Sequence, residues 1–362
     1  MELFIHLWTN LEYFDLLNKG KLLSQGKKDR ELASFFMQNF PGELAETISP
    51  QYEINFMAIR EIKKKFWNNI FEKISGIYYW SDNCEYLVPT KQELEQAIEK
   101  FKEFNKNFPP HKKRTFVFVS PYVWNNMLER VEEWLEFLNN LKIKNPIEVV
   151  VNDFWILNLM FKKYKNLKIC LGRLLHKQLK TPLIDTYWYE VHPAWELIKN
   201  KNSKEIEKLK QEIIKYQLKF YNSSEVELDL YKDFLRSKWI RRVALDYMQK
   251  RESLFTSPQP SFSEERESIG IDLYYPWALI FTGRLCDTSA IENEKRWMYT
   301  IDDICPRTCN RYDIFYKVKT VWYKMIQRWN AWYRSELNLD YLSDEFIKNE
   351  NNRLVFSPFV VV

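Results

Sequence analysis

The chain has 362 residues, a length that suits a single α/β barrel with insertions. Hydrophobic residues make up 46% and charged residues 28%, and the net charge of +5 is spread along the chain, which gives little support for nucleic-acid binding. No run of about 18 apolar residues and no Gly-rich phosphate-binding motif occurs. The N-terminus lacks a basic start and a cleavage site, so we expect a cytoplasmic protein without a membrane span.

Short apolar runs alternate along the chain with stretches of helical periodicity, which favours a parallel sheet with crossover helices. Seven or eight such units favour a closed, TIM-barrel-like α/β fold, a parallel β/α barrel. We expect this single domain at 1–335, with a helical insertion at 20–70 after the first unit, and a C-terminal tail at 336–362. Strands are predicted at 2–8, 74–80, 115–120, 147–153, 167–172, 225–230 and 268–275.

The helix predicted at 91–108 has the clearest start signal, because Thr90 precedes a Glu at the capping-box position. Further helices are predicted at 127–141 and 156–165. Residues 198–220 are predicted to form a long Lys/Glu-rich helix, for which a solvated surface is favoured over contact with a partner or nucleic acid.

Four of the five cysteines occur in an arrangement that suits a metal centre. Cys84 follows the second predicted strand, whereas Cys286, Cys305 and Cys309 lie close together, the last two as C-x3-C. The carboxyl ends of parallel strands share one face of a barrel, so these residues can meet there. Thiolates bind both zinc and iron–sulfur clusters, and the cysteine count does not separate the two. Cys170 lies inside an apolar strand and is expected to be a buried hydrophobic residue.

Polar residues at the strand ends offer a second candidate site. Asn152 and Asp153 end the fourth strand and Arg173 ends the fifth. One interpretation is that these residues bind a substrate. The alternative is a structural role, in which Asp153 caps the following helix or forms an ion pair with Arg173. His176 and His192 lack a partner pattern for zinc or for a catalytic triad, and no motif of nucleophilic hydrolysis occurs.

Three segments resemble the collagenase-like peptidase family (peptidase family U-32), closest to its ubiquinone-biosynthesis branch, UbiV. WALIFTGRLCDTSA with IDDICPRTC is similar to the cluster segment of that branch, and YYWSDNC to the segment with its fourth ligand. The stretch from Glu148 to Pro182 is similar to the V-V-N-D and L-G-R segment of the family.

The resemblance implies a TIM-barrel-like protein that holds one 4Fe-4S cluster through the same four cysteines. It implies a part in oxygen-independent hydroxylation, as in ubiquinone biosynthesis, as one subunit of a heterodimer with a related family member. RNA base hydroxylation and a structural metal-binding scaffold, with zinc as the other metal, are the alternatives. Cys286 is not followed by the second nearby cysteine of the peptidase-labelled members, so proteolysis is not expected. A small-molecule substrate would be bound by Asn152, Asp153, Arg173 and Gln178.

Overall fold

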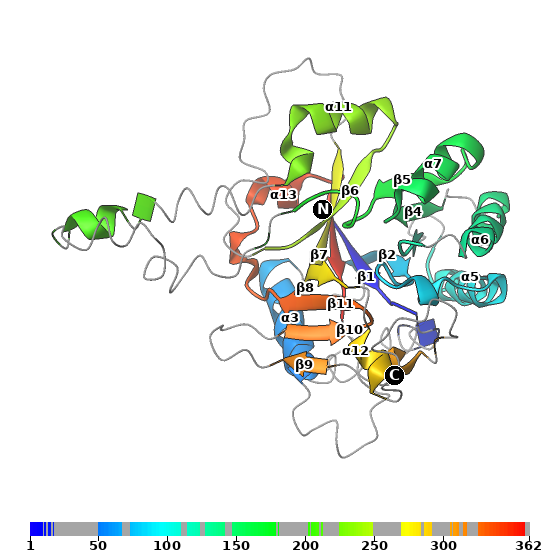
Figure 1. Cartoon of the computed structure of the whole chain (residues 1–362), viewed down its shortest axis with the longest axis horizontal. Coiled ribbons are helices and arrows are strands. Elements are labelled where there is room, and N and C mark those ends of the chain that lie inside the picture. Colours follow the sequence, from blue (N-terminus) through cyan, green and yellow to red (C-terminus); the bar gives the residue numbers. More distant parts are fainter. Residues whose placement is uncertain are drawn as a thin grey trace.

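Eight parallel strands close into a barrel in the computed structural model of the chain (Figure 1). Each strand pairs with its neighbours in sequence, and the last strand closes the ring between the first and the seventh. The predicted TIM-barrel-like α/β fold is therefore confirmed. The strands, in order around the ring, are β1 (Glu2–His6), β2 (Ile74–Tyr79), β3 (Thr115–Val119), β4 (Glu148–Val151), β5 (Lys168–Leu171), β6 (Arg242–Asp246), β7 (Gly270–Tyr275) and β12 (Arg353–Phe356).

The structure describes most of the barrel and its covering helices but not the whole chain. The expected loop at 257–268 and residues 20–49 of the expected insertion lie outside the described residues. Residues 204–209 and 211–212 of the expected Lys/Glu-rich helix are helical, and most of its remainder also lies outside. The described residues are 1–9, 11, 14–15, 17, 50–66, 73–109, 114–123, 127–141, 147–178, 180, 202, 204–209, 211–212, 224–248, 269–283, 286–291, 305, 307–310, 314–316 and 325–358.

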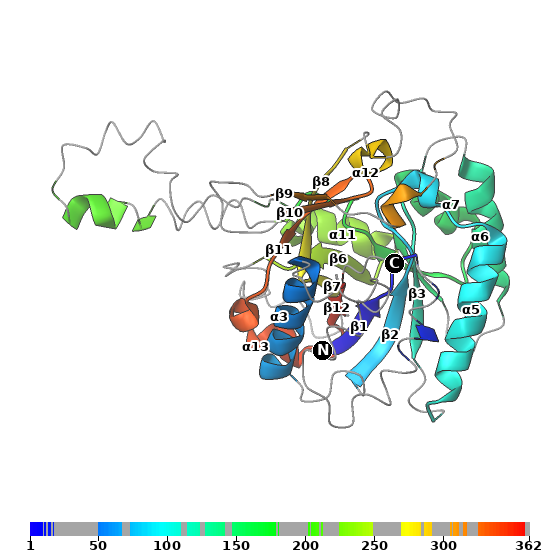
Figure 2. The ribbon, with the colours of Figure 1, turned by 90° about the horizontal axis from the view of Figure 1, so that it is seen from below.

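Amphipathic helices cover the outside of the barrel. In Figure 2, α5 (Lys91–Lys106), α6 (Leu128–Asn140) and α7 (Phe154–Lys163) lie side by side on one flank. The predicted capping box begins α5: the Thr90 hydroxyl accepts from the backbone N–H of Glu93 at 3.2 Å, and the Glu93 carboxylate accepts from the backbone N–H of Thr90 at 2.8 Å. Among the described residues, no helix is long and apolar enough to cross a bilayer.

The described part of the expected insertion is helical and belongs to the barrel. Helix α3 (Pro50–Lys65) connects β1 to β2, the position of the first crossover helix. Its residues Ala58, Ile59 and Ile62 are buried in the main hydrophobic core, because they recur on one face at helical spacing.

One strand prediction is wrong. Residues 225–230 form a 3-10 turn, η5 (Glu225–Glu227), and the start of α11 (Asp229–Ser237) instead of a strand. Of the alternating apolar residues, Val226 packs against the main core, whereas Leu228 and Leu230 are exposed, so no strand face is buried here. Strand β12, which falls within the expected tail at 336–362, completes the barrel.

A second sheet lies over the carboxyl ends of the barrel strands (Figure 2). It is inserted between β7 and β12 and is antiparallel, in the order β8-β11-β10-β9. We call it the lid sheet. An apolar cluster that includes Trp8 and Cys84 of the barrel side and Trp277 and Tyr333 of the lid sheet joins the two layers. Its strands are β8 (Trp277–Thr282), β9 (Ile314–Tyr316), β10 (Met325–Arg328) and β11 (Ala331–Ser335).

Gly76 is required by the close packing of the barrel interior. A Cβ atom at this position would lie 2.6 Å from the carbonyl oxygen of Thr115, and closer still to the ring of Phe4. Phe4 is fully buried in the interior and has no room to move aside.

We expect Gly76→Ala to lower the free energy of unfolding by about 1–3 kcal/mol, the usual cost of overpacking a core. Urea denaturation would measure it, with Ser75→Ala on the opposite face of the same strand as the control, expected to change stability by no more than about 0.5 kcal/mol. Equal effects of the two substitutions would contradict the packing argument.

Candidate functional site

Charged side chains from separate strand ends meet beneath the lid sheet, at the mouth of the barrel. Arg173, after β5, donates from Nε to Asp82 at 3.1 Å and pairs through its other guanidinium nitrogens with Asp82 and with Asp246 at the end of β6. Lys180 also pairs with Asp246. All four side chains are buried or nearly so, and two cations balance two anions. We call them the mouth network.

The ionisation of the mouth network follows from this balance. Burial disfavours the charged form of Asp246, but Arg173 and Lys180 outweigh it and hold the pKa of that carboxyl below its usual value. Burial likewise opposes the charge of Arg173, yet Asp246 and Asp82 raise its pKa well above the ordinary range. For Lys180, burial prevails and lowers the pKa, although Asp246 opposes the shift.

The mouth network also fastens the lid sheet to the barrel. The backbone N–H of Leu279 in β8 donates to Asp246 at 3.1 Å, and the carbonyl oxygen of the same residue accepts from Lys180. On the other side, Asn83 donates to the hydroxyl of Tyr333 in β11. Barrel closure and lid position therefore depend on the same buried charges.

We expect Arg173→Met to lower the free energy of unfolding by about 3–5 kcal/mol, because it leaves Asp82 as a buried carboxylate without a cation. Denaturant unfolding would measure the loss, and adding Asp82→Asn to the same variant should restore part of it. Lys163→Met, which removes an exposed pair with Glu132, is the matched control and should cost at most about 1 kcal/mol. A loss in Arg173→Met as small as in the control would contradict this account.

His6 is a neutral, buried imidazole at the same mouth. Its Nε2 lies 2.6 Å from the carbonyl oxygen of Trp80, so this nitrogen carries the proton, and Nδ1 lies 3.2 Å from the hydroxyl of Ser357. Burial lowers the pKa of His6 to about 4. His176 is similar: its Nε2 donates to the carbonyl of Ala244 at 2.7 Å, and burial lowers its pKa to about 4.

These two histidines predict a loss of stability in mild acid. The unfolded chain takes up protons near the ordinary histidine pKa of about 6.5, whereas the folded state resists protonation until about pH 4. Stability is thus fully present above pH 6.5 and falls as the pH is lowered towards 4, by up to about 3 kcal/mol for each histidine. Urea titrations at a series of pH values between 7.5 and 4.5 would check this, and His176→Gln should flatten the dependence. An unchanged pH dependence in that variant would refute the assignment for His176.

Strained tryptophans surround the mouth. Trp8, Trp80 and Trp329 have φ angles of 52°, 96° and 58°, a region that bulky residues rarely adopt. The rings of Trp8 and Trp329 are 4.8 Å apart, and that of His6 is 3.9 Å from Trp8. The packing of these rings stabilises the strained backbone. Backbone strain of this kind is concentrated at functional sites.

The four predicted cysteines converge at the seam between the barrel mouth and the lid sheet. Cys84 follows Asp82 and Asn83 in the loop after β2, and Cys286 begins the short helix α12 (Asp287–Ala290) after β8. Burial raises the pKa of Cys84 well above its usual value, and its closeness to Cys309, Cys286 and Cys305 raises it further. The structure thus brings together thiols that are more than two hundred residues apart in sequence.

Local contacts position the cysteine segments. Cys286 Sγ lies 3.0 Å from the hydroxyl of Thr288, which in turn donates to the carbonyl of Trp329 in the lid sheet at 3.4 Å. Arg307, between Cys305 and Cys309, pairs with Glu93 at the start of α5 at 2.6 Å. Arg307 therefore anchors its segment to the barrel helices. Arg284 and Trp297, which are also near the cysteines in the sequence, lie outside the described residues.

The chemistry of this donor set fits a soft metal centre, since it contains four thiols that come from three segments. Within the described part of the chain, no three His, Cys, Asp or Glu side chains are grouped as ligands of one metal ion. In a 4Fe-4S cluster each thiolate binds a different iron, so four thiols surround a wider centre than one ion. Cys84, Cys286, Cys305 and Cys309 are the residues that could hold it.

The predicted substrate-binding residues make contacts within the protein. Asn152 donates to the carbonyl of Ser120 at 2.8 Å, and Asp153 caps α7 by accepting from the backbone N–H groups of Trp155 and Ile156. Gln178 exchanges two hydrogen bonds with the backbone of Asp246, at 2.8 and 3.0 Å. Arg173 forms ion pairs with Asp82 and Asp246, and not with Asp153, the partner considered as one alternative to an anionic ligand.

Sequence reasoning did not find Asp82, Asp246, Lys180 or His6. A usable signal existed for two of them: His6 and Asp246 are polar residues that end apolar strands, as Asn152 and Asp153 do. His192 lies outside the described residues. Cys170 is buried in the barrel interior, as predicted. Comparisons of the chain with protein-family models, with curated proteins and with solved structures find no match.

Proposed function

We propose that this chain holds a 4Fe-4S cluster through Cys84, Cys286, Cys305 and Cys309. We further propose that it takes part in oxygen-independent hydroxylation as one subunit of a hetero-oligomer. The observation that carries the cluster is the convergence of four thiols from remote segments at the barrel mouth. The hydroxylation reaction and the related partner subunit are supported by the resemblance of the cysteine segments to the ubiquinone-biosynthesis branch of peptidase family U-32.

The surroundings of the thiols support a shielded centre. Cys84 and Cys309 belong to one apolar cluster with Trp8, Trp277 and Trp329, which excludes water from their side. The pair between Asp82 and Arg173 holds the loop that carries Cys84, two residues further on. A cluster bound here would supply one-electron transfer, and its potential would depend on this apolar shell.

A second candidate function is a binding or scaffold subunit in which the metal centre is structural. The specific observation in its favour is that the mouth network is balanced and satisfied by protein groups under the lid sheet. The charges at the barrel mouth are thus neutralised without a bound substrate. Redox behaviour of the bound centre separates the two functions.

We expect anaerobically purified protein to be brown and to contain about four irons and four sulfides per chain. Cys305→Ser should lose the visible absorption and most of the iron, because one of four ligands is removed. Cys170→Ser is the matched control, since Cys170 lies in the barrel interior and contacts Asp272 at 3.2 Å, so it should keep the full iron content. Iron, sulfide and zinc assays with visible spectra would measure this.

Each result decides between the proposals. Colourless, folded protein with one zinc would replace the cluster by a structural zinc, and equal iron loss in both cysteine variants would refute the assigned ligand set. A cluster that dithionite reduces, with a new electron paramagnetic resonance signal, would favour the hydroxylation subunit. A cluster that stays redox-silent while its removal unfolds the protein would favour the scaffold.

A further inference from the structure

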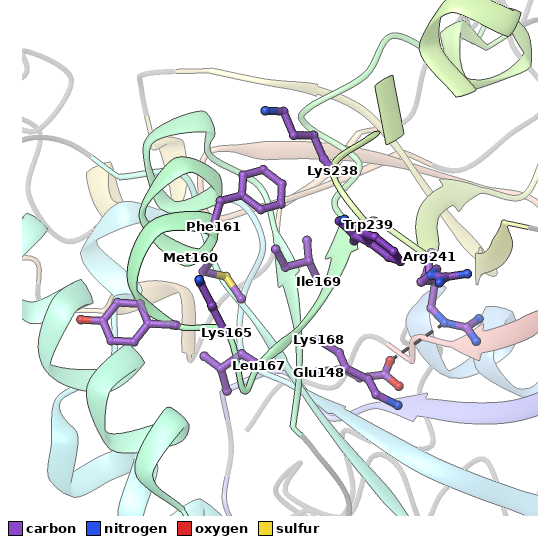
Figure 3. Close-up of a pocket in the computed structure, with 12 residues that line it drawn as sticks. Glu148, Met160, Phe161, Lys165, Leu167, Lys168, Ile169, Lys238, Trp239 and Arg241 are labelled. Atoms are coloured by element: carbon purple, nitrogen blue, oxygen red, sulfur yellow. Dashed lines mark ion pairs between the residues drawn. The ribbon is translucent and has the colours of Figure 1, made fainter. Parts of the chain in front are cut away.

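A groove opens at the amino-terminal end of the barrel, opposite the cysteines. It lies between the ends of α7 and α11, beside the first residues of β4, β5 and β6 (Figure 3). Its volume of ≈ 640 Å³ falls in the range of small-molecule sites, about 300–1,000 Å³. Met160, Phe161, Leu167 and Ile169 contribute to the apolar part of its lining.

The groove carries excess positive charge. The carboxylate of Glu148 is its acidic lining group, and it already accepts hydrogen bonds from Arg353 at 2.6 and 2.9 Å. Lys165, Lys168 and Lys238 are exposed in the same lining, and Lys165 and Lys238 form no ion pair within the described part of the chain. A concave surface with unbalanced cations attracts an anionic ligand.

Trp239 occupies a backbone position that suits glycine. Its φ angle is 57°, and the backbone N–H groups of Trp239 and Ile240 donate to the carbonyls of Arg236 and Leu235 at 3.0 and 2.9 Å. These bonds form a Schellman motif at the end of α11, in which Trp239 holds the left-handed position. The other strained tryptophans, Trp8, Trp80 and Trp329, are buried at the mouth.

The fold does not account for this tryptophan. Its side chain is 77% exposed, so burial of the indole contributes little free energy to offset the strained backbone. Figure 3 shows it at one side of the groove, between Ile169 and Arg241, and the Arg241 guanidinium lies 5.5 Å from the centre of its ring. An exposed indole beside a group of cations offers a stacking surface next to an anion site.

We propose that this groove binds a mononucleotide, with the base stacked on Trp239 and the phosphate attracted by the positive charge of Lys165, Lys168 and Lys238 around the groove. A nucleotide combines the planar ring that the indole face suits with the negative charge that the lysines attract. The size of the groove suits a single nucleotide unit. The site lies at the end of the barrel away from the cysteines, so this proposal does not depend on whether the chain binds a cluster.

Calorimetric titration of the full-length protein with AMP and with UMP tests the assignment. Trp239→Gly should weaken nucleotide binding by about 5- to 150-fold, the range for loss of one stacked base. The same variant should keep or raise the unfolding temperature, because glycine suits the left-handed position. Phe154→Ala is the matched control: this aromatic side chain is 62% exposed at the opposite end of α7, and its removal should leave binding unchanged.

A charge comparison completes the test. The triple variant Lys165→Gln, Lys168→Gln, Lys238→Gln should weaken binding and reduce its salt dependence, whereas the same change in charge at Lys91, Lys102 and Lys106 on α5 should not. Absence of AMP and UMP binding at millimolar concentration, or binding that survives Trp239→Gly, would overturn the proposal. Binding of a ten-residue oligouridylate without binding of either mononucleotide would also overturn it, and would assign the groove to a nucleic-acid strand.

Discussion

The guanidinium of Arg173 between the carboxylates of Asp82 and Asp246 is the interaction on which the functional end of the barrel depends. Asp82 lies in the loop after β2 and Asp246 ends β6. These strands are not neighbours in the ring, so the two aspartates can share one cation only when the barrel is closed. Buried carboxylates require such compensation, since the desolvation cost of an unpaired charge is large. Lys180 supplies the second positive charge by pairing with Asp246. It also donates a hydrogen bond to the carbonyl oxygen of Leu279 and so connects the mouth network to the lid sheet.

The position of the cysteines follows from this constraint. Cys84 lies two residues after Asp82, and Cys286 follows the lid strand that contains Leu279. The ion pair and the lid contact therefore bring two thiol-bearing segments to one seam before any metal binds. A cluster proposed at this seam would connect barrel and lid, with tryptophans on its apolar side.

The two ends of the barrel are separated by a filled interior. Glu148, Arg242, Asp272 and Arg353 form a second buried charge cluster near the amino-terminal end, and Tyr78, near the carboxyl end of β2, donates to Asp272. Aromatic and aliphatic side chains fill the interior around them. The groove proposed to bind a mononucleotide lies outside this filled interior. The groove and the barrel mouth are therefore separate surfaces of the same fold.

The sequence by itself determined the elements whose signals are local. The runs at 74–80, 115–120, 147–153 and 167–172 are mainly apolar and β-branched or aromatic, and the helices after the first three repeat their apolar residues at helical spacing. The strands and helices observed in these ranges therefore agree with the prediction. The spacing of four cysteines likewise identified the candidate ligands, because a soft metal centre needs that residue type in number.

Tertiary structure alone decided the rest. Strands β6 and β12 escaped prediction because they begin with Arg242 and Arg353. The charges of these arginines become compatible with a barrel interior only when Glu148 and Asp272 face them. The mouth network joins residues that are 66 to 91 positions apart, as in the pairs of Lys180 with Asp246 and of Arg173 with Asp82. No local pattern records such a pairing, since the free energy that selects it arises from burying opposite charges together after the ring has closed.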